Sequence, residues 1–469
     1  MIPSLLRPRS SDEYAPVPWD DRLHHAAHLV AERTPEQALA ADDRRATAAV
    51  LRALDDVAGG GFYPIAPEAE QDLAVADEVF APTGPVIDVQ THLIDPTRWR
   101  GDGADALAGY LRMVDGDRWG DAVDPHLLDA AVWATHVFAS SETSIALITS
   151  TPGDVDHNVI LNPQIAAARE LVDRYAGAGR VRTHTIVHPN FGRAELDRMT
   201  DLDDALRPSG WKCYPLYGPP TAASPTGGWF LDDDEIGFPF LERVRASSAP
   251  VVAVHKGLGG PIPSASVAAA SPRDVGPAAA AFPDVTFLVY HSGYERDPDG
   301  EEGAYVPDAR PDARPDAAGG ASTLTGVDRL VASLAGAGIA PGANVYAELG
   351  STWYLMLRRP VEAAHVLGKL LRAVGPDRIV WGTDSIWYGS PQPLIDAFRA
   401  FEIPARMQEE FGYPALSVAT KAKILGVNAR SVYGITDDDV ARAIADRARD
   451  WVTELQPTIA DAITRAGRP

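Results

Sequence analysis

Eight short apolar segments recur along residues 85–400 and alternate with longer stretches of helical character. The helical stretches are rich in Ala, Leu, Arg and Asp, as in residues 162–178 and 360–374. Continuous apolar runs separated by helical patterns are typical of buried parallel strands in βα units. The apolar segments are 86–93, 144–150, 181–187, 210–217, 251–256, 285–291, 344–349 and 379–384. Eight such units predict an α/β fold, a (β/α)8 TIM barrel. The rival is an open doubly wound sheet, but no glycine-rich phosphate loop follows the first segment.

Helical patterns also flank this predicted barrel domain of residues 85–400. Residues 1–84 are expected to form a helical N-terminal extension, and residues 401–469 are expected to form C-terminal helices packed on the barrel. His24, His25 and His28 have no acidic or cysteine partner in register, so we interpret them as part of a polar helix face.

Two insertions interrupt the pattern, and both follow strands at the same end of the barrel. Residues 218–234 are rich in Pro, Gly and Ser. Residues 296–319 contain a tandem Pro-Asp-Ala-Arg repeat, which is typical of a solvent-exposed loop. A role in a lid over that end stays open for both insertions, and for the tandem repeat itself we favour a mobile decoration.

Polar side chains with chemical potential stand at the ends of the apolar segments. Asp88, Gln90 and His92 occupy alternate positions in the first segment, so they share one face of a strand. In a (β/α)8 barrel the chemistry lies at the carboxyl ends of the strands. The other polar residues at these ends are His184, His188, Lys212, His255, Lys256, His291, Glu348 and Asp384. Histidines on several strands with an aspartate on the last predict a metal site for zinc, iron or manganese.

The composition narrows the classes of partner and compartment. Asp and Glu number 65 against 42 Lys and Arg, for a formal net charge of -23. No basic patch is visible, so we expect no nucleic-acid partner and no anionic membrane surface. No apolar run is long enough to span a membrane and no signal-peptide pattern is present, so we expect a cytoplasmic protein. The single Cys213 excludes an internal disulfide and a multi-cysteine metal site.

These motifs resemble those of the amidohydrolase superfamily, in particular its amidohydrolase-related branch. That branch includes aminocarboxymuconate semialdehyde decarboxylase and dihydroxybenzoate-type decarboxylases, which are metal-dependent TIM-barrel enzymes. The resemblance covers roughly residues 85–435. The motifs that carry it are Ile-Asp88-Val-Gln90-Thr-His92, Val-His255-Lys, Tyr-His291-Ser-Gly, Trp-Gly-Thr-Asp384 and Asn428-Ala-Arg430.

The resemblance implies a role for each matching residue. The first strand of that branch ends in a His-x-His pair that binds metal; His92 matches its second histidine, and Gln90 replaces the first. His255 matches the metal ligand of the fifth strand. His291 matches a histidine that acts as acid or base or orients the water. Asp384 matches a carboxylate that binds the metal and takes a proton from water. The metal residues expected in this chain are therefore Gln90, His92, His255, His291, Glu348 and Asp384.

We therefore expect an enzyme that uses a divalent metal ion to hydrolyse, or to decarboxylate without oxidation, a small carboxylate or ring substrate. Zinc is the first expectation for the metal, with iron and manganese as alternatives. A bound ion lowers the pKa of its water, and His291 and Asp384 are expected to move protons as the catalytic residues. The replacement of a histidine by Gln90 weakens the set, because an amide oxygen is a poorer ligand for zinc than an imidazole.

Other residues are expected to bind the small-molecule substrate. Lys212 or Lys256 is expected to neutralise a substrate carboxylate. Lys212 also stands on the strand that carries a carbamylated, metal-bridging lysine in dinuclear members of the superfamily. Trp387 and Tyr388 are expected to form an aromatic wall.

Two further functions stay open at this stage. The first is a dinuclear iron or manganese-iron oxygenase, favoured by Gln90, the extra carboxylates of Asp88 and Glu348, and the spare His184 and His188. The second is a non-catalytic partner subunit that has lost one ligand. Metal analysis separates these functions, because the oxygenase requires two redox metals and the non-catalytic subunit requires none. A homo- or hetero-oligomer also stays open.

Overall fold

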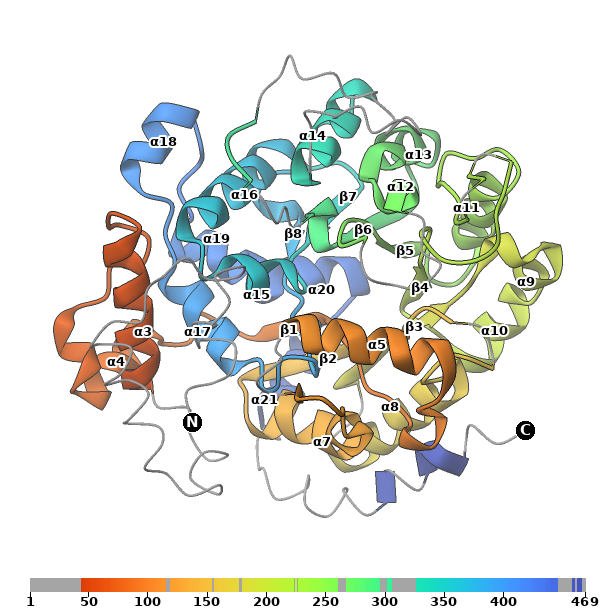
Figure 1. The fold of residues 1–469 in the computed structure, drawn as a ribbon, viewed down its shortest axis with the longest axis horizontal. Coiled ribbons are helices and arrows are strands. Elements are labelled where there is room, and N and C mark those ends of the chain that lie inside the picture. The colour runs from red at the N-terminus through yellow and green to blue at the C-terminus, as the bar shows by residue number, and fades with distance from the viewer. Residues whose placement is uncertain are drawn as a thin grey trace.

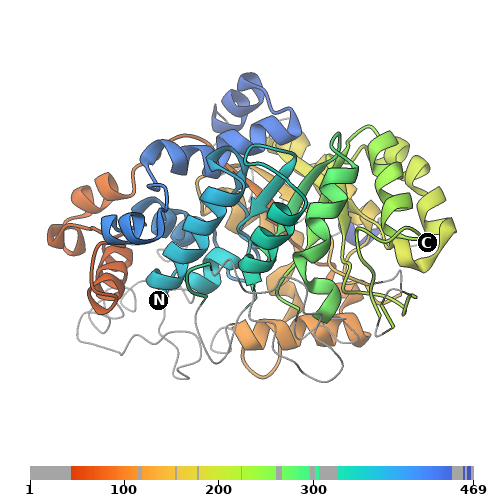
Figure 2. The ribbon, with the colours of Figure 1, turned by 90° about the horizontal axis from the view of Figure 1, so that it is seen from above.

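The eight strands form one parallel sheet in the order β1 to β8, which confirms the predicted (β/α)8 TIM barrel. Figure 1 and Figure 2 show the helices arranged around the strands. The computed structural model describes residues 44–114, 119–153, 156–176, 179–222, 224–225, 227–259, 267–295, 302–305, 326–445, 458–459 and 462–465.

The strands are short and almost entirely buried, as their apolar sequences require. Their bounds are β1 Val86–Thr91, β2 Thr143–Ile148, β3 Val181–Ile186, β4 Gly210–Cys213, β5 Val251–His255, β6 Thr286–Tyr290, β7 Val345–Glu348 and β8 Ile379–Val380. Every neighbouring pair from β1 to β8 is parallel. The chain after β8 closes the barrel onto β1, where Val89 N donates to Trp381 O at 2.9 Å and Asp384 N donates to Gln90 O at 2.9 Å.

Side chains alternate along each strand between the barrel interior and the surrounding helices. Ile87, Val89, Ile145 and Leu288 belong to an inner cluster that fills the barrel. Val86, Ala146, Phe287 and Val289 belong instead to the larger core shared with the helices. The helices are α3 Arg44–Val57, α4 Leu73–Val79, α5 Gly101–Val114, α7 Ala130–Ala134, α8 Asn162–Ala176, α9 Arg193–Asp197, α10 Met199–Leu206, α11 Gly237–Ala246, α12 Val267–Ala270, α13 Val275–Ala281, α14 Gly326–Gly336, α15 Thr352–Met356, α16 Pro360–Ala373, α17 Gln392–Ala400, α18 Ala405–Phe411, α19 Val418–Ala422, α20 Asn428–Tyr433 and α21 Asp437–Ala445.

The C-terminal helices cover the amino-terminal end of the barrel. Ala429 on α20 and Val440 on α21 join the inner apolar cluster. Asn428 Nδ2 donates to Pro376 O at 2.9 Å and to Ile379 O at 2.7 Å, at the start of β8. The Asn-Ala-Arg motif therefore has a visible structural role: its asparagine satisfies backbone carbonyls that precede a strand.

The described part of the N-terminal extension is helical and packs on the outside of the barrel, with α3 against α17 (Figure 1). Arg44 anchors it, because its guanidinium lies 2.7 Å from Glu142 Oε1 and 3.3 Å from Asp396 Oδ1. The three histidines at 24, 25 and 28 lie outside the described residues, as does most of the predicted insertion 296–319.

The predicted eighth strand is longer than the actual one. β8 ends at Val380, and residues 381–384 leave strand geometry. Gly382 explains part of this bend, since a Cβ there would lie 1.7 Å from Glu348 Oε1. Asp384 itself has a φ of 61°, a conformation that non-glycine residues rarely adopt. The bend carries the Asp384 carboxylate to the end of the barrel where β1 delivers Gln90 and His92.

Candidate functional site

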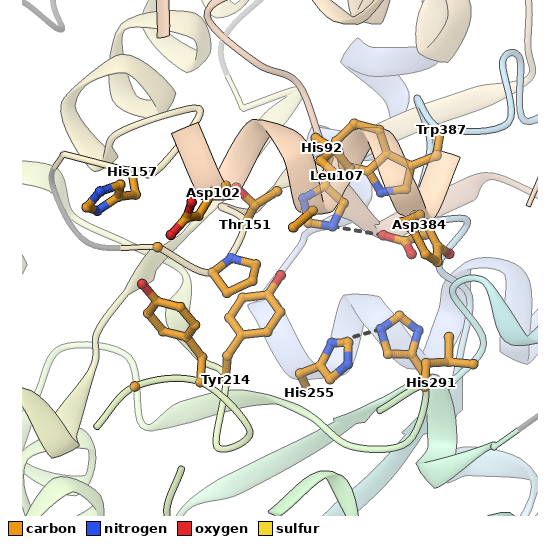
Figure 3. A pocket seen from close by; sticks show the side chains of 18 of the residues that line it. His92, Asp102, Leu107, Thr151, His157, Tyr214, His255, His291, Asp384 and Trp387 are labelled. Atoms are coloured by element: carbon orange, nitrogen blue, oxygen red, sulfur yellow. Dashed lines mark hydrogen bonds and ion pairs between the residues drawn. The ribbon is translucent and has the colours of Figure 1, made fainter. Parts of the chain in front are cut away.

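A cavity of about 480 Å³ opens at the carboxyl ends of the strands (Figure 3). The polar side chains that line it are, among others, Gln90, His92, His255, His291 and Asp384. Aromatic side chains line other parts of it, including Tyr110, Phe191, Tyr214, Tyr217 and Trp387. Residues 217–220 also line it, so the first predicted insertion contributes to a wall of the cavity. The barrel has brought polar residues of strands one, five, six and eight together where a TIM barrel places its chemistry.

Asp384 receives hydrogen bonds on both carboxylate oxygens. Gln90 Nε2 donates to its Oδ1 at 2.8 Å, and His92 Nε2 lies 2.8 Å from the same oxygen. Ser351 Oγ donates to Oδ2. Burial alone would raise the pKa of Asp384, but the hydrogen bonds from His92 and Ser351 hold that pKa below its ordinary value. The carboxylate is therefore ionised at neutral pH.

His291 and His255 form a second pair with a defined direction of hydrogen bonding. His291 Nδ1 lies 2.6 Å from Gly350 O, and a carbonyl can only accept, so Nδ1 carries the proton. Burial lowers the pKa of His291 to about 4, so its Nε2 then holds a lone pair. That Nε2 lies 3.1 Å from His255 Nδ1, which must donate. The remaining nitrogen, His255 Nε2, is left with a lone pair, since burial and the neighbouring His291 also lower the pKa of His255.

Three buried acceptor atoms of this group have no hydrogen-bond partner within the described structure: Gln90 Oε1, His92 Nδ1 and His255 Nε2. A His92 ring whose one N–H is on Nε2, directed at Asp384, has a lone pair on Nδ1. Buried lone pairs are costly unless a donor or a cation meets them. Figure 3 shows the His92–Asp384 and His255–His291 pairs facing each other across the cavity. The donor atoms thus suit a divalent cation, although no three His, Cys, Asp or Glu side chains in the described ranges already gather closely enough to hold one.

The carboxylates of Glu348 and Asp88 are occupied by the backbone and do not line the cavity. Glu348 Oε2 accepts from His291 N at 3.0 Å, and Oε1 accepts from Gly350 N at 2.6 Å. Asp88 Oδ1 accepts from Gln90 N and Thr383 N, each at 3.1 Å. Both groups are fully buried, and burial raises the pKa of Glu348 to about 8 and that of Asp88 to about 7.

These bonds stabilise the loops that carry the site. Residues that follow β6, β7 and β8 adopt left-handed conformations: His291 has a φ of 64°, Ser351 of 54° and Asp384 of 61°. Backbone strain of this kind persists where surrounding contacts hold it, and it is frequent at functional sites. Glu348 and Asp88 supply such contacts, because they bind backbone N–H groups of His291 and of the residue before Asp384.

The structure places both candidate substrate lysines outside the cavity lining. Lys256 is fully buried and pairs with Asp274, its Nζ lying 2.8 Å from Oδ2. Lys212 is also fully buried, and its Nζ lies 3.7 Å from the ring centre of Tyr290 and 4.4 Å from that of Tyr214. Burial lowers the pKa of Lys212 to about 7. No hydrogen-bond partner of Lys212 Nζ lies within the described residues.

The remaining candidates divide between the cavity and the core. Trp387 lines the cavity and stacks on His92, with ring centres 5.1 Å apart. Tyr388 is buried beside it and bonds to Ser351 Oγ at 2.6 Å. His184 is held in the barrel core, where Nδ1 lies 2.9 Å from Tyr290 Oη. His188 bonds to Gly153 O at 2.9 Å.

Sequence reasoning missed Ser351, which donates directly to Asp384. Its only sequence signal is its position, three residues after Glu348 at the end of the seventh strand. It also missed Tyr110, which lies on α5, in the long connection between β1 and β2, and lines the cavity. No periodic pattern identifies such loop-borne residues, because their contacts depend on the tertiary fold.

Comparison with known proteins gives the family. The family model described as Amidohydrolase matches residues 87–435, which is more than half of the chain. A solved structure of 5-carboxyvanillate decarboxylase from Sphingomonas paucimobilis is 14% identical, covers 75% of this chain and 99% of its own, and has a TM-score of 0.40. Dihydroxybenzoic acid decarboxylase from a Polaromonas species, solved with manganese and the inhibitor 2-nitroresorcinol, is 14% identical, covers 76% and 99%, and has a TM-score of 0.42. No curated protein matches the chain at a significant level. The chain therefore belongs to the amidohydrolase family of enzymes.

Proposed function

We propose that this protein is a hydrolase or carboxy-lyase that depends on a divalent metal and acts on a small ring substrate in the cavity at the carboxyl ends of the strands. The observation that carries the proposal is the group of unpaired acceptor atoms, Gln90 Oε1, His92 Nδ1 and His255 Nε2, beside the ionised Asp384. The family assignment independently favours hydrolytic or related chemistry.

These four side chains would hold the ion. Two imidazole nitrogens, an amide oxygen and a carboxylate form a mixed set that suits zinc, manganese and iron. Zinc remains the prediction from the sequence, while the amide oxygen of Gln90 favours manganese more than a third imidazole at that position would. When bound, the ion supplies Lewis-acid chemistry, since it polarises an oxygen and lowers the pKa of water.

His291 is the proposed proton-transfer residue. Gly350 O fixes its Nδ1–H, so Nε2 is the atom that takes or gives a proton. Asp384 fixes the ring of His92 and accepts from Gln90, so it orients both residues of β1. Glu348 has a supporting role in this proposal, because its two oxygens already accept backbone N–H groups at the site.

A ring substrate fits the shape and chemistry of the cavity. Its volume of about 480 Å³ admits a molecule of one or two rings, and tyrosine, phenylalanine and tryptophan side chains supply stacking surfaces. Within the described residues, neither lysine nor arginine lines the cavity. The proposal therefore pairs a substrate carboxylate with the metal ion rather than with Lys212 or Lys256.

The oxygenase alternative requires a second metal and more ligands. The carboxylates that would provide them, Asp88 and Glu348, are bound to backbone amides, and His184 and His188 bond to Tyr290 and Gly153. This arrangement favours one ion over two. Metal analysis also separates the enzyme from a non-catalytic partner subunit, which would bind no metal. Among the described helices, none combines the length and apolar character needed to cross a bilayer.

The test begins with chelator-stripped protein reloaded with manganese, zinc or iron(II). Each form is offered hydroxylated benzoates, with carbon dioxide release as the readout, and ring esters, with acid release as the readout. The proposal expects turnover only in a metal-loaded form, and loss of turnover in His255→Ala. Oxygen consumption by the wild type without either product would instead favour the oxygenase.

The Gln90→His variant refines the test. Imidazole is a stronger ligand than an amide oxygen, so the variant should bind metal at least as tightly and keep part of the activity. Oxygen-dependent turnover that disappears in Gln90→His with metal content unchanged would contradict the proposal.

A further inference from the structure

Three hydroxyl groups gather on the side of Asp384 that faces away from Gln90 and His92. Ser351 Oγ donates to Asp384 Oδ2 and lies 2.6 Å from Tyr388 Oη and 3.0 Å from Tyr110 Oη. The two phenols also hydrogen-bond to each other. We call Ser351, Tyr388 and Tyr110 the hydroxyl cluster. Its members come from the segments after β7 and β8 and from α5.

The protons of the hydroxyl cluster have a defined direction. Ser351 Oγ donates its single proton to Asp384 Oδ2, so that proton is not available to the phenols. Ser351 Oγ can then only accept within the hydroxyl cluster, where two phenolic protons serve three contacts. At least one phenol therefore donates to Ser351 directly, and the other donates either to Ser351 or to the first phenol. A phenol has an ordinary pKa of about 10, so both tyrosines carry the protons they donate at neutral pH. The phenols therefore polarise Ser351, and Ser351 bonds to the carboxylate.

Rigid surroundings hold each member of the cluster. Tyr388 stacks on Tyr354 with ring centres 3.7 Å apart and planes 10° from parallel. Ser351 has a φ of 54°, which a non-glycine residue adopts only when contacts enforce it. Tyr110 belongs to α5, a helix whose Asp102, Ala106 and Leu107 also line the cavity.

We propose that Ser351, Tyr388 and Tyr110 are positioning residues that fix the Asp384 carboxylate, and that Tyr110 thereby ties α5 to the centre of the site. With Oδ2 held by Ser351, Oδ1 is presented to Gln90 and His92 at a set angle. A carboxylate free to rotate would present either oxygen, so the cluster selects one orientation. The inference rests on the proposed function in one respect, since it takes Asp384 as part of the metal site.

The first test measures manganese affinity by calorimetry in two Ser351 variants. Ser351→Ala removes the hydroxyl and keeps the backbone strain, whereas Ser351→Gly removes the hydroxyl and relieves the strain. Partners of metal ligands typically contribute about 10–100-fold to affinity. Both variants should therefore bind manganese about 10-fold or more weakly, and their cobalt-loaded forms should show an altered visible spectrum. Wild-type affinity and an unchanged spectrum in both would overturn the proposal.

The second test asks whether the phenols act through Ser351. Tyr388→Phe and Tyr110→Phe should each weaken manganese binding about fivefold in the wild-type background, the effect of one lost hydrogen bond. In the Ser351→Ala background the same changes should have no further effect, because the connecting hydroxyl is gone. Tyr63→Phe is the control, since Tyr63 is a buried tyrosine that donates to Leu357 O away from the site. Additive effects would contradict positioning through Ser351.

The third readout does not require metal. Tyr110→Phe should increase amide hydrogen exchange in α5 relative to the wild type and to Tyr63→Phe, because it removes the hydroxyl that bonds α5 to the segments after β7 and β8. If the wild type binds no metal, the proposed function fails. Amide hydrogen exchange in α5 still tests whether Tyr110 holds α5 against the site. Exchange equal to the wild type would overturn that tie.

Discussion

Lys256 provides a sharp test of what the polar residues at the strand ends do. It follows the proposed ligand His255 directly, yet its ammonium group is fully buried against Asp274, also fully buried. Nζ donates to Asp274 Oδ2 at 2.8 Å and to Ala269 O at 2.9 Å. We predict that Lys256→Met destabilises the fold and leaves the binding of ring substrates intact.

The size of the destabilisation follows from the buried groups that lose their partner in Lys256→Met. Removing one partner of a buried ion pair costs about 3–5 kcal/mol, because the other charge stays buried without compensation. Asp274 Oδ2 would keep its bond from Leu231 N, at 2.7 Å in the wild type. The double variant Lys256→Met with Asp274→Leu has no stranded carboxylate, so it should be more stable than the single variant. It should remain about 1–3 kcal/mol less stable than the wild type, because the Leu231 N–H loses its acceptor.

Urea unfolding of the wild type, the single variant and the double variant measures these free energies. Calorimetry with a hydroxybenzoate on metal-loaded protein measures the binding that Lys256 would support if it met substrate. A single variant with wild-type stability and lost binding would refute the reasoning and make Lys256 a substrate-binding residue. A double variant less stable than the single one would refute the role of the stranded charge.

Three further predictions concern the site and its surroundings. Glu348→Gln should keep the metal content but lower the free energy of unfolding by about 1–3 kcal/mol, since an amide cannot accept both backbone N–H groups; metal loss at unchanged stability would identify Glu348 as a ligand. His291→Ala should abolish turnover with the circular dichroism spectrum and metal content unchanged, and an unfolded variant would assign His291 a structural role. Burial lowers the pKa of His184 to about 3 from 6.5, so the folded state resists protonation and loses stability as pH falls below 6.5. From His184 alone that loss is about 2 kcal/mol between pH 7 and pH 5, and urea unfolding of His184→Asn should show a correspondingly flatter pH dependence.

The barrel was predictable because eight short, largely apolar segments recur between helical patterns, as buried strands of a parallel sheet do. The end of β8 was not predictable, since the bend after Val380 depends on Gly382 lying against Glu348 from another strand. A pattern within one segment carries no information about such contacts between segments.

The sequence predicted which side chains share a strand face, but it did not predict how deep in the barrel each of them lies. Asp88, Gln90 and His92 share one strand face, but two residues of a strand rise about 6.6 Å, so Asp88 lies deeper in the barrel and bonds to backbone amides. The alternation of side chains along a strand predicts which face a side chain is on, but it does not predict the position of that side chain along the barrel axis. The pairing of Lys256 with Asp274 likewise depends on a helical segment 18 positions away.

The most direct test of the central claim is a calorimetric titration of chelator-stripped protein with manganese and with zinc. We predict one ion per chain, with affinity reduced at least about 100-fold in His255→Ala, which loses one of two proposed nitrogen ligands. His184→Asn serves as the matched control, because His184 is an equally buried strand histidine outside the cavity lining, and its affinity should equal that of the wild type. No binding by the wild type, two ions per chain, or equal affinity in His255→Ala would contradict the account.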